Sequence, residues 1–152
     1  MTKLEFSLNL PANSDKLMQL ATDYENFVNY LPDQIKSVKI IEKNSNETIT
    51  EEVLVFTTIM KNEIVQSSKH KKVNPNQLQS EIISGPFSGS KLLALYAPVE
   101  SGTKVTITAN LKIPLKYKVI SLVIKKMYKI ILTGILYKMN RIALDSSKID
   151  MK

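Results

Sequence analysis

The sequence contains no cysteine and no tryptophan, and it has one histidine and one arginine among its 152 residues. Without cysteine the protein forms neither disulfides nor thiolate zinc sites, so it needs no oxidising compartment. It shows no metal-ligand spacing, nucleophile motif or phosphate-binding glycine loop, and we therefore predict no metal site and no cofactor. Residues 1–10 alternate polar and apolar side chains without a hydrophobic run of the signal-peptide type, which predicts a cytoplasmic location.

The segment from Leu115 to Leu144 contains no proline and no acidic residue, and Gly134 is its only glycine. Pro114 is well placed to open a helix, so we predict one long helix over this segment. Its lysines argue against a membrane span, because each lysine at the centre of a bilayer costs about 2.5–3.5 kcal/mol. Positive charge is concentrated here: residues 1–100 carry ten cations and twelve acids, whereas residues 101–152 carry eleven cations and two acids.

Alternating and β-branched residues earlier in the chain predict strands separated by short turns. Asn13 or Ser14 can cap a first short helix, and a second covers about Tyr24–Tyr30 and stops before Pro32. Short turns between consecutive strands indicate an antiparallel meander. We predict one α+β domain over residues 1–152, with a seven-stranded antiparallel sheet curled around the C-terminal helix. The predicted strands are Lys3–Leu10, Ile35–Lys43, Thr48–Met60, Glu63–Val73, Gln77–Ser84, Lys91–Val99 and Thr103–Ile113.

Two local passages and the order of the predicted elements carry a family resemblance. The passages are the run 24–32 followed by Ile35 and Val38, and the turn Ser84-Gly85-Pro86-Phe87. Together they resemble the START-like (helix-grip, SRPBCC) superfamily of polyketide cyclases, dehydrases and lipid-transport proteins. The turn is similar to that of the coenzyme Q-binding branch, although the tryptophan usual in that branch is absent. The resemblance implies an apolar cavity between helix and sheet that receives a lipid, a quinone or a polyketide-like molecule.

The apolar residues of the long helix gather on one side of a helical wheel, and this side should face the concave sheet. Methionine suits an adaptable pocket, and tyrosine adds one hydroxyl to an apolar wall. Phe27 and Tyr30, on the second short helix, should border the entrance. The alternative for each residue is ordinary core packing. The residues that we predict to contact the ligand are Phe56, Phe87, Tyr96, Ile107, Ile120, Ile124, Met127 and Tyr128.

The opposite side of the long helix mixes lysines with leucines, which an ordinary solvated face would not contain. Lysines beside exposed aliphatic groups are typical of contact with an anionic membrane surface. We therefore predict that the protein lies at the inner face of a membrane, with the leucines touching the N-terminal helices or a second subunit as the alternative. The oligomeric state is left open. The residues of this predicted membrane or partner surface are Lys118, Leu122, Lys125, Lys129 and Leu136.

An enzyme would need a group that transfers protons, and the candidates are few. His70 lies among lysines beside a turn, so we predict an exposed strand end, and we expect Glu51, Glu52 and Glu63 to face water. We accordingly assign no catalytic residue and favour a non-enzymatic carrier of a hydrophobic small molecule. A polyketide cyclase or dehydratase is the alternative, and it requires Glu52 or His70 to project into the pocket.

A module that binds ribosome, RNA or protein through the basic helix is a second alternative. Nucleic acid is the less favoured partner, because lysine is poor at reading bases and no aromatic platform interleaves with the cations.

Overall fold

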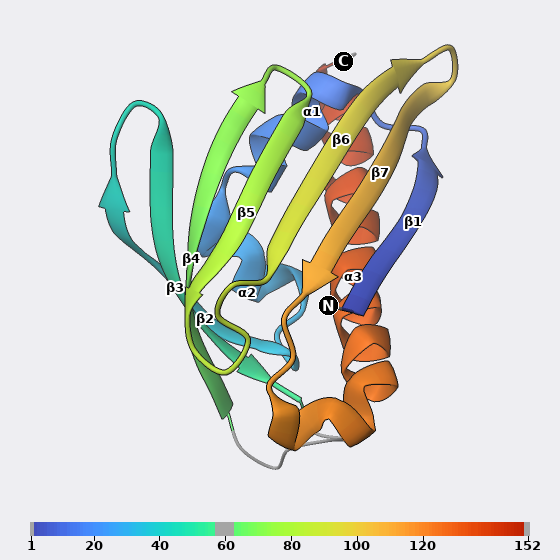
Figure 1. Cartoon of the computed structure of the whole chain (residues 1–152). Helices are drawn as coiled ribbons and strands as arrows, with labels where there is room; N and C mark the ends of the chain where they lie inside the picture. Colours follow the sequence, from blue (N-terminus) through green and yellow to red (C-terminus); the bar gives the residue numbers. More distant parts are fainter. Residues whose placement is uncertain (1, 57–62, 151–152) are drawn as a thin grey trace.

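The computed structural model describes residues 2–56 and 63–150, and for residues 147–150 it describes the backbone only. Seven strands form one antiparallel sheet in the order β1-β7-β6-β5-β4-β3-β2, and helices lie before β2 and after β7 (Figure 1). The elements are β1 (Thr2–Leu10), α1 (Ser14–Ala21), η1 (Tyr24–Asn26), α2 (Phe27–Tyr30), β2 (Ile35–Lys43), β3 (Glu47–Val55), β4 (Glu63–Asn74), β5 (Gln77–Ser84), β6 (Lys91–Val99), β7 (Gly102–Leu111), η2 (Leu115–Ile120) and α3 (Ser121–Asp150).

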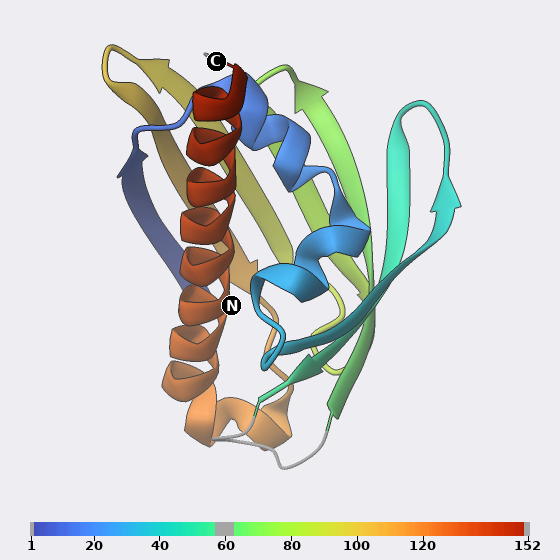
Figure 2. The ribbon, with the colours of Figure 1, turned by 180° about the vertical axis from the view of Figure 1, so that it is seen from behind.

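The sheet curls around α3, with α1 and α2 beside that helix (Figure 2). This arrangement confirms the predicted helix-grip fold. The predicted strands Ile35–Lys43, Gln77–Ser84 and Lys91–Val99 match β2, β5 and β6 residue for residue. Residues 57–60, the end of the third predicted strand, lie outside the described residues.

The last strand, β7, shows why one face of the sheet is buried. Apolar residues alternate with polar ones along β7, as the sequence predicts for a sheet covered on one side. Ile113, just after the strand, is buried, and the apolar members of the strand are all buried too, with no more than 4% of their surface exposed: Val105, Ile107, Ala109 and Leu111. Burial of this face against α3 and the short helices supplies the core.

The long helix differs from its prediction in two respects. Its first residues, Leu115–Ile120, form the 3₁₀ helix η2, and the α-helix begins only at Ser121. Figure 1 shows η2 crossing the end of the sheet before α3 turns along it. The buried stripe of α3 is also wider than the wheel indicates, because α1 and α2 cover a second side of the helix. Leu136 packs with the cluster that contains Leu17 and Met18 of α1, whereas Val123, on the side that the wheel predicts to face the sheet, remains 43% exposed.

Among the helices that the structure describes, none has the length and apolar character needed to cross a membrane.

Candidate functional site

A cavity of about 200 Å³ lies between α3 and the concave face of the sheet. Most of its wall is aliphatic and comes from elements far apart in the sequence: β5, β6 and β7 on one side and α3 on the other. The aliphatic residues that line it include Leu78, Leu92, Ala94, Ile107, Ala109, Leu132 and Ile135. Ala94 and Ala109 leave room here, because their side chains are smaller than those of Ile107 and Leu92, their partners across β6 and β7.

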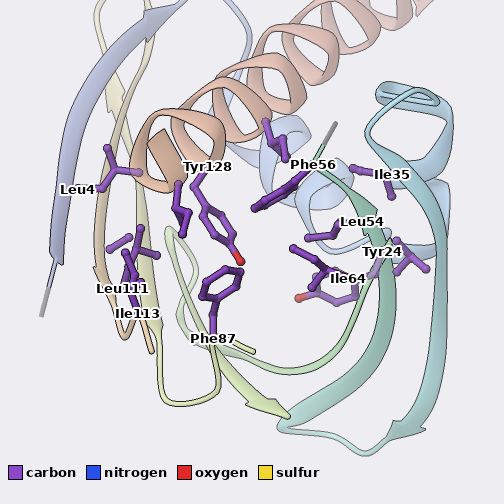
Figure 3. Packing of buried hydrophobic residues seen from close by; sticks show 14 residues of the cluster. Leu4, Tyr24, Ile35, Leu54, Phe56, Ile64, Phe87, Leu111, Ile113 and Tyr128 are labelled. Carbon is purple, nitrogen blue, oxygen red and sulfur yellow. The ribbon is translucent and has the colours of Figure 1, made fainter. Parts of the chain in front are cut away.

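An aromatic cluster fills the space beside the cavity (Figure 3). The ring of Tyr128 stands edge-on to Phe56 and Phe87, with ring centroids 5.4 and 5.8 Å apart. Phe56 and Phe87 have no exposed surface and do not line the cavity. Tyr128 belongs to both regions, since it packs in this cluster and also lines the cavity.

The predicted ligand contacts therefore separate into two groups. Tyr96, Ile107 and Tyr128 line the cavity, and so does Phe27 of the predicted entrance. The remaining ligand predictions, Phe56, Phe87, Ile120, Ile124 and Met127, pack in or against the core cluster instead. Tyr30, predicted to border the entrance, is 4% exposed and does not line the cavity. Phe56, Phe87 and Ile124 have no exposed surface, because other side chains enclose them.

A row of polar side chains crosses the cavity wall on β3, β4 and β5. We call these residues the polar row: Thr50, Glu52, Gln66, Ser68, His70 and Ser80. Strand geometry brings them together, since residues two apart share a face of a strand. Thr50 lies opposite Ser68 in the register of β3 and β4, and Glu52 lies opposite Gln66. His70 lies opposite Ser80 in the register of β4 and β5.

His70 is held on both sides by hydroxyl groups. Its Nε2 is 2.8 Å from Thr50 Oγ1, and its Nδ1 is 2.7 Å from Ser80 Oγ. The ring stacks on Tyr24, with centroids 4.2 Å apart and planes 17° from parallel. Burial lowers the pKa of His70 from 6.5 to about 4, so the imidazole is neutral at physiological pH. The prediction of an exposed strand-end histidine was therefore wrong.

Glu52 is the acidic member of the polar row. Burial raises the pKa of its carboxyl from 4.5 to about 7, although hydrogen bonds from Ser68, Thr50 and Gln66 lower it. Its Oε2 atom is buried without a hydrogen-bond partner. Glu51 and Glu63 are exposed, as predicted, but the expectation that Glu52 faces water was wrong. A carboxyl that is half protonated near neutral pH can both give and accept a proton.

The turn before β6 approaches the polar row closely. Gly85 adopts a φ of +105°, and a Cβ atom added there would lie 2.8 Å from Val65 O and 2.9 Å from Gln66 Cβ. Replacing Gly85 by alanine should thus lower the free energy of unfolding by roughly 1–3 kcal/mol, from backbone strain and displacement of β4. Chemical denaturation measures this loss. Ser88→Ala, in the same turn and exposed, is the control, and an equal loss in both variants would contradict this explanation.

The predicted membrane or partner surface is only partly exposed. Lys118, Leu122 and Lys129 are exposed, and Lys125 is half-buried. Leu136 does not belong to this surface: it is 3% exposed and lines the cavity, because α1 covers that side of α3. The most exposed apolar side chains of this region lie nearer the start of the helix. They are Leu115, Val119 and Leu122, with 86%, 97% and 76% of their surface exposed.

Solved structures of distant sequence share this fold. TTHA0849 from Thermus thermophilus matches with a TM-score of 0.81 at 18% identity, over 96% of this chain and 99% of that one. The Zhui aromatase/cyclase from a Streptomyces species has a TM-score of 0.77 at 11% identity, over 92% of this chain and 94% of that one. A START superfamily protein from Mycobacterium smegmatis has a TM-score of 0.71 at 12% identity, over 94% and 97%. At such identities the likeness shows the helix-grip fold alone.

No protein-family model matches the sequence. No curated protein matches it either.

Proposed function

We propose that the protein binds and carries a hydrophobic small molecule in the cavity between α3 and the sheet. The cavity and its largely aliphatic wall carry this proposal. Ligand pockets are typically concave and apolar, with a few polar groups that fix orientation, and the polar row supplies such groups. The START superfamily and aromatase/cyclase proteins that share the fold support the same class of ligand.

The size of the cavity limits the ligand. A cavity of about 150 Å³ lined by aliphatic and aromatic residues binds benzene in another protein, so about 200 Å³ admits a molecule of one or two rings. A lipid or an isoprenoid quinone, the ligands predicted from the sequence, would place only its ring or part of one chain inside. Extraction of the purified protein with organic solvent, followed by mass spectrometry, tests for such a molecule. Repeated recovery of no apolar compound would count against the carrier.

We propose further that the exposed start of the C-terminal helical region contacts an anionic membrane. Leu115, Val119 and Leu122 are exposed, and Lys118 and Lys126 beside them are exposed cations. Shallow insertion of aliphatic side chains combined with attraction of lysine to anionic lipid is how interfacial helices bind. A carrier that exchanges its ligand with a membrane needs such a contact.

Replacing Val119 and Leu122 by glutamate should reduce binding to vesicles that contain phosphatidylserine several-fold, because each change removes an inserting side chain and adds a repelled charge. Sedimentation with these vesicles, and with phosphatidylcholine vesicles alone, measures the bound fraction. Val65→Glu is the control, since Val65 is 53% exposed on β4. The membrane contact is wrong if the double variant and the control sediment with the anionic vesicles as the wild type does.

The polar row also favours a second candidate function, an enzyme of the polyketide cyclase type. Glu52 lines the cavity with a pKa raised by burial to about 7, near the optimum for a general acid or base. As a carboxylate it would remove a proton from the carbon between two carbonyl groups, and as a carboxylic acid it would return one. Deuterium exchange at that carbon of a cyclic β-diketone, followed by NMR, tests this function. Exchange that is equally fast with Glu52→Gln would exclude Glu52 as the base.

A further inference from the structure

We propose that the ligand of the cavity is a hydrophobic molecule with one hydroxyl group, an alcohol or a phenol, and that Glu52 binds this hydroxyl. The inference rests on the proposed function, because it names the chemistry of the same ligand. Glu52 lines the cavity, and its Oε2 has no hydrogen-bond partner. An unpaired polar atom in a buried wall is costly, and a ligand that pairs with it removes the cost.

The hydrogen bonds of the polar row can all run toward Glu52. Bonds that lower a carboxyl pKa are those donated to the carboxylate, and Thr50, Ser68 and Gln66 act in this way on Glu52. If the Thr50 hydroxyl donates to Glu52, its oxygen accepts from His70 Nε2–H, 2.8 Å away. His70 Nδ1 then accepts from the Ser80 hydroxyl at 2.7 Å. On the other side, Tyr128 donates its hydroxyl to Gln66 Oε1 at 3.5 Å.

In this direction the carboxyl group is the one acceptor of the row that can carry a negative charge, and its Oε2 has no hydrogen-bond partner. Both nitrogens of His70 are already paired, and the amide oxygen of Gln66 already accepts from Tyr128. The last torsion of a glutamate side chain is soft, so a partial rotation about it can turn Oε2 toward the cavity. The carboxyl group can thereby present its unpaired oxygen to a molecule in the cavity.

A hydroxyl suits this carboxyl better than a carbonyl or an ammonium group. The other titratable side chains of the cavity wall are Tyr24, His70, Lys91, Tyr96 and Tyr128, and Lys91 is exposed. Burial raises the pKa of all three tyrosines and lowers that of His70 to about 4. Of the shifted groups, only Glu52 therefore changes charge near pH 7. A hydroxyl donates to the carboxylate and accepts from the carboxylic acid, whereas a carbonyl only accepts and an ammonium only donates.

The test compares four probes on one aromatic frame by fluorescence titration. Naphthalene measures the apolar cavity, 2-naphthol adds a hydroxyl, 2-methoxynaphthalene adds an acceptor, and 2-naphthylmethylamine adds a cation. For the wild-type protein we expect 2-naphthol to bind at least about tenfold more tightly than naphthalene, as a charge-assisted hydrogen bond provides. This advantage of about tenfold applies at pH 8, where Glu52 is mostly a carboxylate; at pH 6, where it is mostly protonated, the advantage should be smaller.

Two substitutions on β3 assign the effect to Glu52. In Glu52→Leu the advantage of 2-naphthol over naphthalene should disappear while naphthalene still binds. In Glu51→Leu, on the exposed face of the same strand, the advantage should remain. If Glu52→Leu does not fold, the comparison of 2-naphthol with 2-methoxynaphthalene on the wild type at pH 8 replaces it, and 2-naphthol should again bind at least about tenfold more tightly.

The outcomes separate this inference from the proposed function. If naphthalene binds but 2-naphthol binds no more tightly, or if Glu52→Leu keeps the advantage, the hydroxyl site is wrong and the carrier stands. If 2-methoxynaphthalene equals 2-naphthol at pH 8, or the amine binds more tightly, the proposed ligand chemistry is wrong. If none of the four probes binds, the proposed function itself fails.

Discussion

Replacing Glu52 by glutamine is expected to stabilise the protein by about 3 kcal/mol more at pH 8 than at pH 4.5. Burial raises the pKa of Glu52 to about 7, whereas the carboxyl of the unfolded chain ionises near 4.5. Between these values the folded state holds the proton more tightly than the unfolded state does. The free energy of unfolding therefore falls as the pH rises through this window, and glutamine, which has no proton to lose, removes the fall.

His70 acts in the opposite direction. Burial lowers its pKa from 6.5 to about 4, so the unfolded state binds the extra proton and stability rises as the pH rises from about 4 to 6.5. In the wild type the two trends oppose each other, and the free energy of unfolding should change little between about pH 4.5 and 6.5 on account of these groups. Glu52→Gln should expose the rise due to His70.

Urea denaturation at a series of pH values measures both effects. Glu51→Gln is the matched control, because Glu51 precedes Glu52 on β3 and is exposed. It should change the free energy of unfolding by no more than about 0.5 kcal/mol at any pH. A Glu52→Gln effect that is the same at pH 4.5 and pH 8 would show that this carboxyl is not desolvated in the folded protein.

Replacing Ala94 by leucine is expected to abolish binding of naphthalene without a loss of stability. Ala94 is 4% exposed and lines the cavity beside Ile107 of β7. The added carbon atoms would occupy the part of the cavity in which we propose that the ligand binds. Because they fill an empty space, they should not strain the core or lower the free energy of unfolding. If the space were solidly packed, the same substitution would overpack it and cost about 1–3 kcal/mol.

Fluorescence titration and urea denaturation of this variant decide between the two results. Ala97→Leu is the control: it lies on the same strand, does not line the cavity and should bind naphthalene as the wild type does. Retained binding in Ala94→Leu would place the ligand elsewhere. Loss of stability with loss of binding would mean that no cavity exists at Ala94.

Much of the fold could be predicted because turn residues and alternation mark it locally. Asn44-Ser45-Asn46 and Asn74-Pro75-Asn76 end apolar runs, and the end of β2 and the start of β5 were accordingly predicted correctly. The alternation in β7 assigned its buried face. The break between η2 and α3 could not be predicted, since 3₁₀ and α-helix share the same apolar residues over a short stretch.

The cavity wall was harder to predict because its polar part contradicts the usual rule. Polar residues in strands normally face water, yet Thr50, Glu52, Gln66 and His70 face inward. The available signal was the alternation of side chains along a strand, in which residues two apart lie on the same face. Gln66 lies two residues from the buried Ile64, and Glu52 lies two residues from the buried Leu54. Phe56 and Phe87 were predicted to contact the ligand, with core packing as the alternative, and in the structure both belong to the packed cluster.

The proposed function requires that a small molecule bind in the space between α3 and the sheet. Intermolecular nuclear Overhauser effects from naphthalene to methyl-labelled protein test this binding. We predict contacts to the methyl groups of Ala94, Ile107 and Leu132, which line the cavity. Contacts confined to the exposed Val119 and Leu122, or no contacts at saturating naphthalene, would contradict the proposed function.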